Sequence, residues 1–204
     1  DFFFYLFLAV IIGGRIGYIL FYNINFYIDH PLNIFKVWEG GMSFHGALIG
    51  VILTTLIFSK KNSIPIFLLS DLLSICAPIG IFFGRLSNFI NKELIGRQTD
   101  FLISINYPGE NISRHISQIY EVIFEGLLPA IILLIIFLKK KTKNGILTAI
   151  FLINYSISRF LIEFIRQPDM QVGLKLEIFT QGQILTIPII FLGILILYQC
   201  QSKQ

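Results

Sequence analysis

Long apolar stretches alternate with short polar ones along most of this chain. A helix needs about 20 mostly apolar residues to cross the hydrocarbon core of a bilayer. The pattern therefore predicts an all-α, polytopic transmembrane helical bundle that forms one integral membrane domain over residues 1–204. The six predicted spans are residues 2–22, 44–59, 64–90, 117–138, 145–165 and 182–199. In the third span, Gly80 and Gly84 are expected to let a neighbouring helix come close.

The lysines at the ends of these stretches predict an orientation. Seven of them lie in three short segments without acidic residues, and alternation of six spans puts all three segments on one side. Lysine-rich loops stay in the cytoplasm, so this side is predicted to be cytoplasmic. These lysines are Lys60, Lys61, Lys139, Lys140, Lys141, Lys143 and Lys203.

The segments 23–43, 91–116 and 166–181 then fall on the opposite side. Residues 91–116 are polar and rich in turn-forming residues, which predicts an extracytoplasmic arm. Residues 29–40 place Leu32, Phe35 and Trp38 among charged residues, and this pattern predicts a short amphipathic helix along the membrane interface.

Composition supports a membrane protein and narrows the chemistry. The chain is 55% hydrophobic, more than a soluble domain of 204 residues would bury. The net charge of +4 does not indicate nucleic-acid binding, because the lysines cluster at span ends. Cys76 and Cys200 predict no disulfide, and no Cys/His cluster has metal-ligand spacing. Since Asp1 already lies in an apolar stretch, we expect the chain to lack its natural N-terminus.

Arginine, not lysine, occupies the spans and their outer ends. Arg159, Glu163 and Arg166 share one helical face at offsets of four and seven. Arginine inside a membrane costs at least about 2.5–3.5 kcal/mol on insertion scales, so this face is not predicted to meet lipid. One interpretation is a structural ion-pair stripe that joins two spans. The other is an anion site, because guanidinium groups bind phosphate in a bidentate manner.

Other outer span ends bring polar groups to a similar depth. Arg85 and Asn88 lie on one face, with Glu93 following; they predict either a hydrogen-bonded polar pocket or a snorkelling arginine beside a helix cap. His45 lies among small residues and is either an interfacial side chain or a general base. Tyr155 precedes Arg159 by one turn and is predicted to donate its hydroxyl group to the same site.

Two charged residues in the apolar stretches need partners. Arg15 is expected to pair with an acidic group or to contact lipid headgroups. Asp71 lies in the third span towards the lysine side, and the sequence does not name its partner. Taken together, the residues favour an outward-facing site for a phosphate-bearing amphiphile, or the anion site of a transporter.

Three segments carry a specific resemblance. They are 39–46 (EGGMSFHG), 84–97 (GRLSNFINKELIGR) and 159–169 (RFLIEFIRQPD), and together with Arg114-His115, Ser117-Gln118, Tyr120-Glu121 and Gly182-Gln183 they span the chain. The sequence resembles the bacterial prolipoprotein diacylglyceryl transferases, and the segment 84–97 resembles the family signature. Ser87, Ala47 and Ile116 depart from residues common in that family.

The resemblance implies a seven-span enzyme of the bacterial cytoplasmic (inner) membrane, with its active site towards the periplasmic or outer leaflet. The six spans predicted here then imply that the chain lacks the first of the seven. It implies transfer of the diacylglyceryl group from phosphatidylglycerol to the cysteine thiol in the signal-peptide lipobox of a preprolipoprotein. A thioether forms and glycerol-1-phosphate leaves. No metal, cofactor or nucleic acid is expected, and the bilayer itself is a partner.

The resemblance also implies roles for individual residues. The catalytic residues would be His45, Arg85 and Arg159, with His45 as the base. The residues that bind substrate would be Arg85, Asn88, Glu93, Gly96, Tyr155, Glu163 and Arg166. A transporter or flippase of an anionic amphiphile is the alternative function, and a noncatalytic membrane scaffold is a third.

Overall fold

The computed structural model describes residues 1–139, 142–167, 174–175 and 179–202. The chain divides into two compact units, Asp1–Leu69 and Ser70–Gln204, and each is described by itself. The prediction of a single domain stays a prediction. Several residues used above, Lys140, Lys141, Pro168, Asp169 and Lys203, lie outside the described residues.

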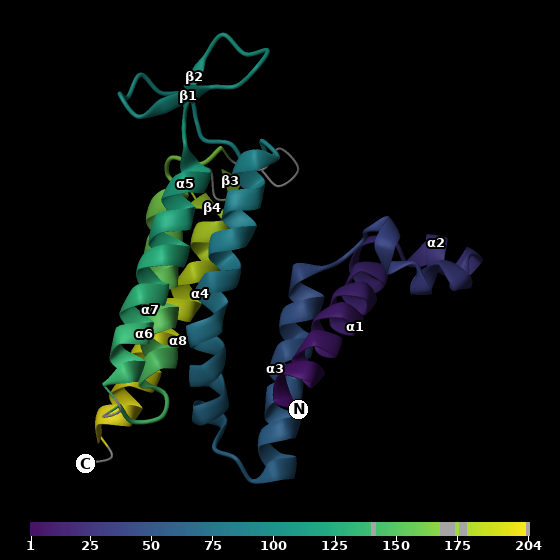
Figure 1. Cartoon of the computed structure of the whole chain (residues 1–204). Coiled ribbons are helices and arrows are strands. Elements are labelled where there is room, and N and C mark those ends of the chain that lie inside the picture. Colours follow the sequence, from purple (N-terminus) through teal and green to yellow (C-terminus); the bar gives the residue numbers. More distant parts are fainter. Residues whose placement is uncertain (140–141, 168–173, 176–178, 203–204) are drawn as a thin grey trace. The chain divides into compact units, whose positions relative to one another are not determined.

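The first unit is a pair of antiparallel helices joined by short turns (Figure 1). Helix α1 (Phe2–Tyr22) packs on α3 (Phe44–Asn62) through glycines on both helices. A Cβ on Gly46 would lie 2.2 Å from the Gly13 carbonyl oxygen, and one on Gly50 would lie 2.5 Å from the Ala9 carbonyl oxygen. The two backbones therefore touch, which is how membrane helices associate where lipid gives no hydrophobic drive.

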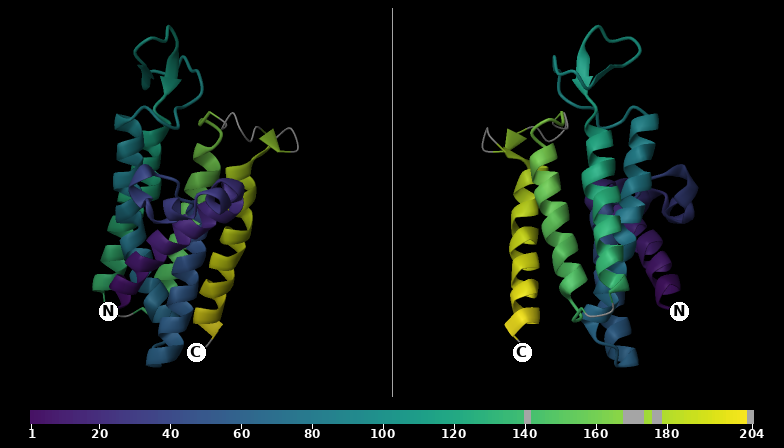
Figure 2. Two further views of the ribbon diagram at one scale, coloured as in Figure 1. Left: turned by 90° about the vertical axis from the view of Figure 1, so that its right-hand side faces the viewer. Right: turned by 60° about the vertical axis from the view of Figure 1, so that its left-hand side comes forward.

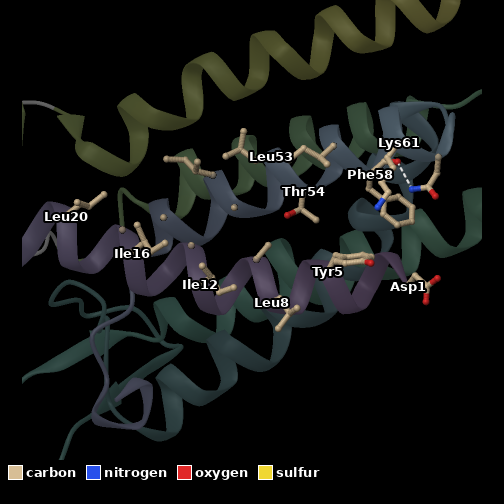
Figure 3. Close-up of a pocket in the computed structure, with 18 residues that line it drawn as sticks. Asp1, Tyr5, Leu8, Ile12, Ile16, Leu20, Leu53, Thr54, Phe58 and Lys61 are labelled. Carbon is tan, nitrogen blue, oxygen red and sulfur yellow. Dashed lines mark hydrogen bonds between the residues drawn. The ribbon is translucent and has the colours of Figure 1, made fainter. Parts of the chain in front are cut away.

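An apolar groove runs along these two helices. It has a volume of about 670 Å³ and is lined only by residues of the first unit. Figure 3 shows side chains of α1, among them Leu8, Ile12 and Ile16, and Leu53 of α3 along its length.

The connection between α1 and α3 is built around Arg15. It contains α2 (Ile24–Asp29) and two 3₁₀ turns, η1 (Pro31–Phe35) and η2 (Val37–Glu39). The short helix predicted over 29–40 is thus two 3₁₀ turns, and its place at the membrane interface stays a prediction. Arg15 is buried, and each of its five N–H donors reaches a backbone carbonyl. The acceptors belong to Asn33, Ile34, Lys36, Gly40 and Gly41, at 2.5–3.2 Å. These carbonyls, not the expected acidic group, are the partners of Arg15.

The second unit is a helical bundle with a hairpin at one end (Figures 1 and 2). Its helices are α4 (Ile66–Ile90), α5 (Ser117–Glu121), the π-helical segment η3 (Val122–Leu127), α6 (Leu128–Leu138), α7 (Ile146–Ile162) and α8 (Gln181–Ser202). Strands β1 (Ser104–Asn106) and β2 (Ser113–His115) form an antiparallel hairpin, as do β3 (Leu174–Lys175) and β4 (Phe179–Thr180). The β1–β2 hairpin lies in the predicted arm and projects beyond the ends of α4 and α5 (Figure 1).

The helices of the second unit pack closely at two glycines. Helices α7 and α8 lie side by side, and a Cβ on Gly193 would lie 2.8 Å from the Ile153 side chain (Figure 2). A Cβ on Gly126 would lie 2.8 Å from Phe82 of α4. Around Gly80 and Gly84 no atom comes within 4 Å of such a Cβ, so the described residues do not place the expected helix contact there.

Asp71 connects the start of α4 to the start of α7. Its carboxylate accepts hydrogen bonds from the Gly145 amide at 2.7 Å, the Thr148 amide at 2.8 Å and the Thr148 hydroxyl at 2.6 Å. Amides in the first turn of a helix have no partner within that helix, and a carboxylate there also meets the positive end of the helix dipole. Asp71 thus caps α7 from another helix, which supplies the partner that the sequence left unnamed.

The membrane-spanning character is clear from the helices. Among the described residues, four helical stretches are long and apolar enough to cross a membrane: Phe2–Leu20, Ile66–Ile90, Ser117–Leu138 and Gly182–Ser202. Ile146–Ile162 is a shorter apolar helix. The chain is a polytopic helical membrane protein, and the count of six spans stays a prediction.

Candidate functional site

A break in one helix of the second unit sets up the site. Between α5 and α6 the chain forms the π-helical segment η3, which ends two residues before Pro129. Proline has no N–H to give to the carbonyl of Glu125, four residues earlier, so the regular ladder cannot continue there. Short π-helical segments occur often at functional sites. Gly126 lets α4 approach η3 at Phe82. Arg85 lies about one turn further along α4, so its side chain comes within reach of the glutamates of α5 and η3.

Three arginines from separate parts of the unit converge on Glu121, the last residue of α5. Its Oε1 lies 2.5 Å from Arg159 Nη1 and 3.5 Å from Arg166 Nη1, and its Oε2 lies 3.4 Å from Arg85 Nε. Glu121 is fully buried. A buried carboxylate is tolerated only with such partners, so Glu121 joins α4, α5 and α7 at this point.

Two further glutamates complete the cluster. Glu163 Oε2 lies 2.8 Å from Arg159 Nη2. Glu125 lies farther from its partners, with Oε2 3.4 Å from Arg85 Nη2 and Oε1 3.8 Å from Arg159 Nη1. The cluster therefore contains three arginines and three glutamates, and its formal charges balance. We call Arg85, Glu121, Glu125, Arg159, Glu163 and Arg166 the charged cluster.

The chain that follows α7 forms backbone hydrogen bonds with the segment that follows α4. The Arg97 amide donates to the Ile165 carbonyl at 2.8 Å, and the Gln167 amide donates to the Ile95 carbonyl at 3.1 Å. Gly96 lies opposite Arg166 in this pairing, and a Cβ on Gly96 would lie 2.2 Å from the His115 carbonyl oxygen. Only glycine fits there, so Gly96 determines how closely the hairpin and the α7 exit approach each other.

The end of α4 has the turn that this pairing requires. Lys92 has a φ of 59°, and the amides of Lys92 and Glu93 donate to the carbonyls of Phe89 and Asn88. This is the Schellman arrangement, which ends a helix and reverses the chain. The Glu93 carbonyl in turn accepts from the buried Gln118 side chain at 2.7 Å.

The start of α8 also contacts the charged cluster. Thr180 and Gln183 form a capping box, in which the Gln183 amide donates to Thr180 Oγ1 at 3.3 Å and the Thr180 amide donates to Gln183 Oε1 at 3.0 Å. A Cβ on Gly182 would lie 3.1 Å from the carboxylate of Glu163. The first turn of α8 thus packs directly on that carboxylate.

The structure brings some of the predicted site residues together. Arg85, Arg159, Glu163 and Arg166 are members of the charged cluster. Tyr155 lies one turn before Arg159 on α7, Asn88 lies near the end of α4, and Glu93 is exposed in the following turn. His45 is the second residue of α3, exposed in the first unit, so its place in the site stays a prediction.

Sequence reasoning missed the two central carboxylates. Glu121 appeared only as part of a motif, and Glu125 was not singled out. A signal was present, because residues 117–138 contain two glutamates four positions apart in an otherwise apolar span. Such residues are costly in a membrane unless they are paired, and pairing with the arginines of the other spans was therefore to be expected.

The cluster is suited to holding an anion. Of the Arg85 side chain 19% is exposed, and of the Arg159 side chain 12%, whereas Glu121 and Glu125 are fully buried. Arg85 and Arg159 thus have the most accessible side chains in the charged cluster. Among the described residues, no group of three or more His, Cys, Asp or Glu side chains is arranged to hold a metal ion.

Fold and cluster together define a polytopic helical membrane protein with a buried arginine–glutamate site. The family model of prolipoprotein diacylglyceryl transferase matches residues 1–199. The chain therefore belongs to the prolipoprotein diacylglyceryl transferase family.

Curated relatives carry one name, phosphatidylglycerol–prolipoprotein diacylglyceryl transferase. The relative from Ehrlichia canis (strain Jake) is 49% identical over 191 residues, which cover 91% of this chain and 73% of the relative. That from Ehrlichia ruminantium (strain Welgevonden) is 50% identical over 194 residues, or 93% and 75%. That from Rickettsia bellii (strain OSU 85-389) is 43% identical over 203 residues, or 98% and 77%.

Proposed function

We propose that this chain is a phosphatidylglycerol–prolipoprotein diacylglyceryl transferase. The cysteine sulfur of the lipobox attacks the diacylglyceryl carbon that carries the phosphate. The S–C bond forms, the C–O bond to phosphate breaks, and the phosphate oxygen keeps the electron pair and leaves as part of glycerol-1-phosphate. Membership of the family and the names of the relatives support this reaction.

The observation that carries the proposal is the convergence of Arg85 and Arg159 on one buried carboxylate, Glu121. A phosphate that gains charge as it leaves is stabilised by fixed cations in a site shielded from water. Arg85 and Arg159 bind the phosphate group in this scheme, while Glu121 orients their guanidinium groups. The paired formal charges keep the empty site neutral, so the cations can persist within the membrane.

The remaining residues have supporting roles. His45 accepts the thiol proton, since a thiol is a weak nucleophile until it is deprotonated and histidine exchanges protons near neutral pH. Asn88, Tyr155 and Gly96 contact or shape the site for the glycerol headgroup. Glu163 and Arg166 hold Arg159 and the chain that leaves α7 in position, and Glu93 supports the turn after α4.

The proposed reaction also implies how the protein lies in the membrane. We propose six spans in the bacterial inner membrane, with the lysines on the cytoplasmic side and the charged cluster towards the periplasmic or outer leaflet. Phosphatidylglycerol then enters from that leaflet, and the signal-peptide lipobox of the preprolipoprotein meets it there. The hairpin formed by β1 and β2 is the extracytoplasmic arm in this arrangement.

The test uses the protein in phosphatidylglycerol vesicles with a lipobox peptide. We expect release of glycerol-1-phosphate together with a peptide whose mass has increased by one diacylglyceryl group. The control is the same peptide with serine in place of its cysteine, which should give neither product. Movement of phosphatidylglycerol across the bilayer without thioether formation would favour a transporter and reject the proposal.

A further inference from the structure

Glu125 holds an unusual position within the charged cluster. It is fully buried in η3, and neither of its carboxylate oxygens accepts a hydrogen bond from the described residues. It nevertheless lies between two partly buried arginines, 3.4 Å from the guanidinium group of Arg85 and 3.8 Å from that of Arg159. Glu125 therefore bridges α4 and α7 by charge, without the short contacts of a charge-assisted hydrogen bond.

The other two carboxylates are held more firmly. Glu121 accepts a hydrogen bond of 2.5 Å from Arg159, and Glu163 lies 2.8 Å from the same guanidinium group. Those distances are at or below the usual range for charged partners. Of the three glutamates, Glu125 is the one that the arginines can release with the least loss of bonding.

Arg85 is correspondingly available. Its two ion-pair contacts, to Glu121 and to Glu125, are each 3.4 Å, and 19% of its side chain is exposed. A phosphate oxygen that reached Arg85 could form shorter, directed bonds than either carboxylate now makes. An anion would thus compete with both carboxylates at Arg85, but Glu121 would keep its hydrogen bond to Arg159, whereas Glu125 has none to keep among the described residues.

We propose that Glu125 is a placeholder for the substrate phosphate. With no headgroup bound, it keeps Arg85 and Arg159 facing each other and balances their charge. When the headgroup binds, the guanidinium groups turn to the phosphate, and the nearby negative charge of Glu125 weakens their hold on it. Glu125 is then a positioning residue that lowers the affinity for anions and speeds the departure of glycerol-1-phosphate. This inference rests on the proposed function, because it takes the phosphate site to lie at Arg85 and Arg159.

The test compares the protein with its Glu125→Gln variant, which keeps the shape of the side chain and removes its charge. Removing one negative charge beside two guanidinium groups should tighten the binding of glycerol-1-phosphate by about three- to tenfold, allowing for screening near the membrane surface. The KM for phosphatidylglycerol should fall in the same direction. The kcat should fall as well, because product leaves more slowly and the two arginines lose their spacer. A residue that only stabilised the fold would not lower the dissociation constant.

Glu39→Gln is the matched control. Glu39 forms an exposed ion pair with Lys36 at 3.5 Å, so the same chemical change there should leave the dissociation constant unaltered. Affinity is measured by equilibrium dialysis of labelled glycerol-1-phosphate, and thermal unfolding shows that each variant is folded. An unchanged or weaker affinity in folded Glu125→Gln overturns the proposal.

A second variant covers the case in which Glu125→Gln does not fold. Glu125→Asp keeps the charge and withdraws it by one methylene group, so a smaller gain in affinity is expected, and weaker or unchanged binding again overturns the proposal. Turnover by the unsubstituted protein tests the transferase reaction separately. A protein that forms thioether but shows no affinity change in these variants loses only the role assigned to Glu125.

Discussion

The two units of this protein bury arginine in different ways. In the first unit, Arg15 gives all five of its N–H donors to backbone carbonyls of residues 33–41. In the second unit, Arg85 and Arg159 face carboxylates that come from another helix. Backbone carbonyls belong to the fold and cannot move independently, whereas carboxylates on long side chains can give way to another anion.

Under the proposed function, this difference separates a structural arginine from one that binds substrate. A guanidinium group whose donors are all satisfied has none to offer a ligand, and Arg15 is also covered on one side by the ring of Tyr27, 5.2 Å away. Arg85 makes only long contacts and remains partly exposed. Arginine in an apolar stretch is therefore not by itself a sign of a binding site. The nature of its acceptors decides between the two roles.

The largest effect is expected for Arg85→Ala. Loss of a cation that stabilises the leaving phosphate should reduce turnover by about 10²–10³-fold or more. The unfolding temperature should fall as well, because the buried carboxylates of Glu121 and Glu125 lose a partner. Release of glycerol-1-phosphate from phosphatidylglycerol vesicles measures the first quantity and thermal unfolding the second. Near-normal turnover would remove Arg85 from the site and end the contrast with Arg15.

Arg15→Ala should lower stability without lowering turnover. Five carbonyls lose their donors, and an unsatisfied buried polar group costs about 1–3 kcal/mol where water cannot replace the lost partner. We expect the protein to be destabilised by about 3 kcal/mol in total, since part of the opened turn can take up water. Proteolysis within residues 31–41 should become faster, and the turnover of each folded molecule should persist. A folded, stable Arg15→Ala protein that has lost activity would show that Arg15 acts in the site after all.

The smallest effect is expected for Asp71→Asn. Asparagine retains one acceptor for the first turn of α7 and loses the charge that favours the helix dipole, so a loss of about 0.5–1 kcal/mol is expected. Thermal unfolding of the variant checks this value, and Lys61→Gln, in the last turn of α3, provides a control change of one charge elsewhere. A much larger loss would mean that Asp71 carries more of the contact between α4 and α7 than its hydrogen bonds account for.

The sequence predicted the helices better than it predicted their breaks. Apolar length placed the spans because lipid leaves few alternatives to a helix with all its backbone groups paired. It did not reveal the π-helical segment η3, since that depends on Pro129 together with the close approach of Gly126 to Phe82. The turns around Arg15 were likewise missed. Their conformation is set by a side chain distant in sequence, and the local amphipathic pattern of 29–40 suggested a helix instead.

For the site, the arginines and Glu163 were singled out from the sequence, and the two central carboxylates were not. Arg85, Arg159, Glu163 and Arg166 were singled out because charge in an apolar stretch is rare. Glu125 was overlooked because its importance lies in its position between helices that are distant in sequence. The four-residue offset of Arg159 and Glu163 predicted a local ion pair, and that pair is present at 2.8 Å. Pairing across helices needs the packing of α4, η3 and α7, which no single segment encodes.

The cap that Asp71 forms on α7 has a mechanical consequence for the arginines. Arg85 lies 14 residues after Asp71 on α4, and at 1.5 Å per residue this makes a lever of about 21 Å. If the contacts of Asp71 stay intact, tilting this part of α4 by about 5° would shift Arg85 by about 2 Å. A displacement of this size would break the contact of 3.4 Å between Arg85 and Glu121. The hydrogen bonds between Asp71 and the start of α7 would remain. A small tilt of α4 would thus separate Arg85 from Glu121 and Glu125 while Asp71 still caps α7.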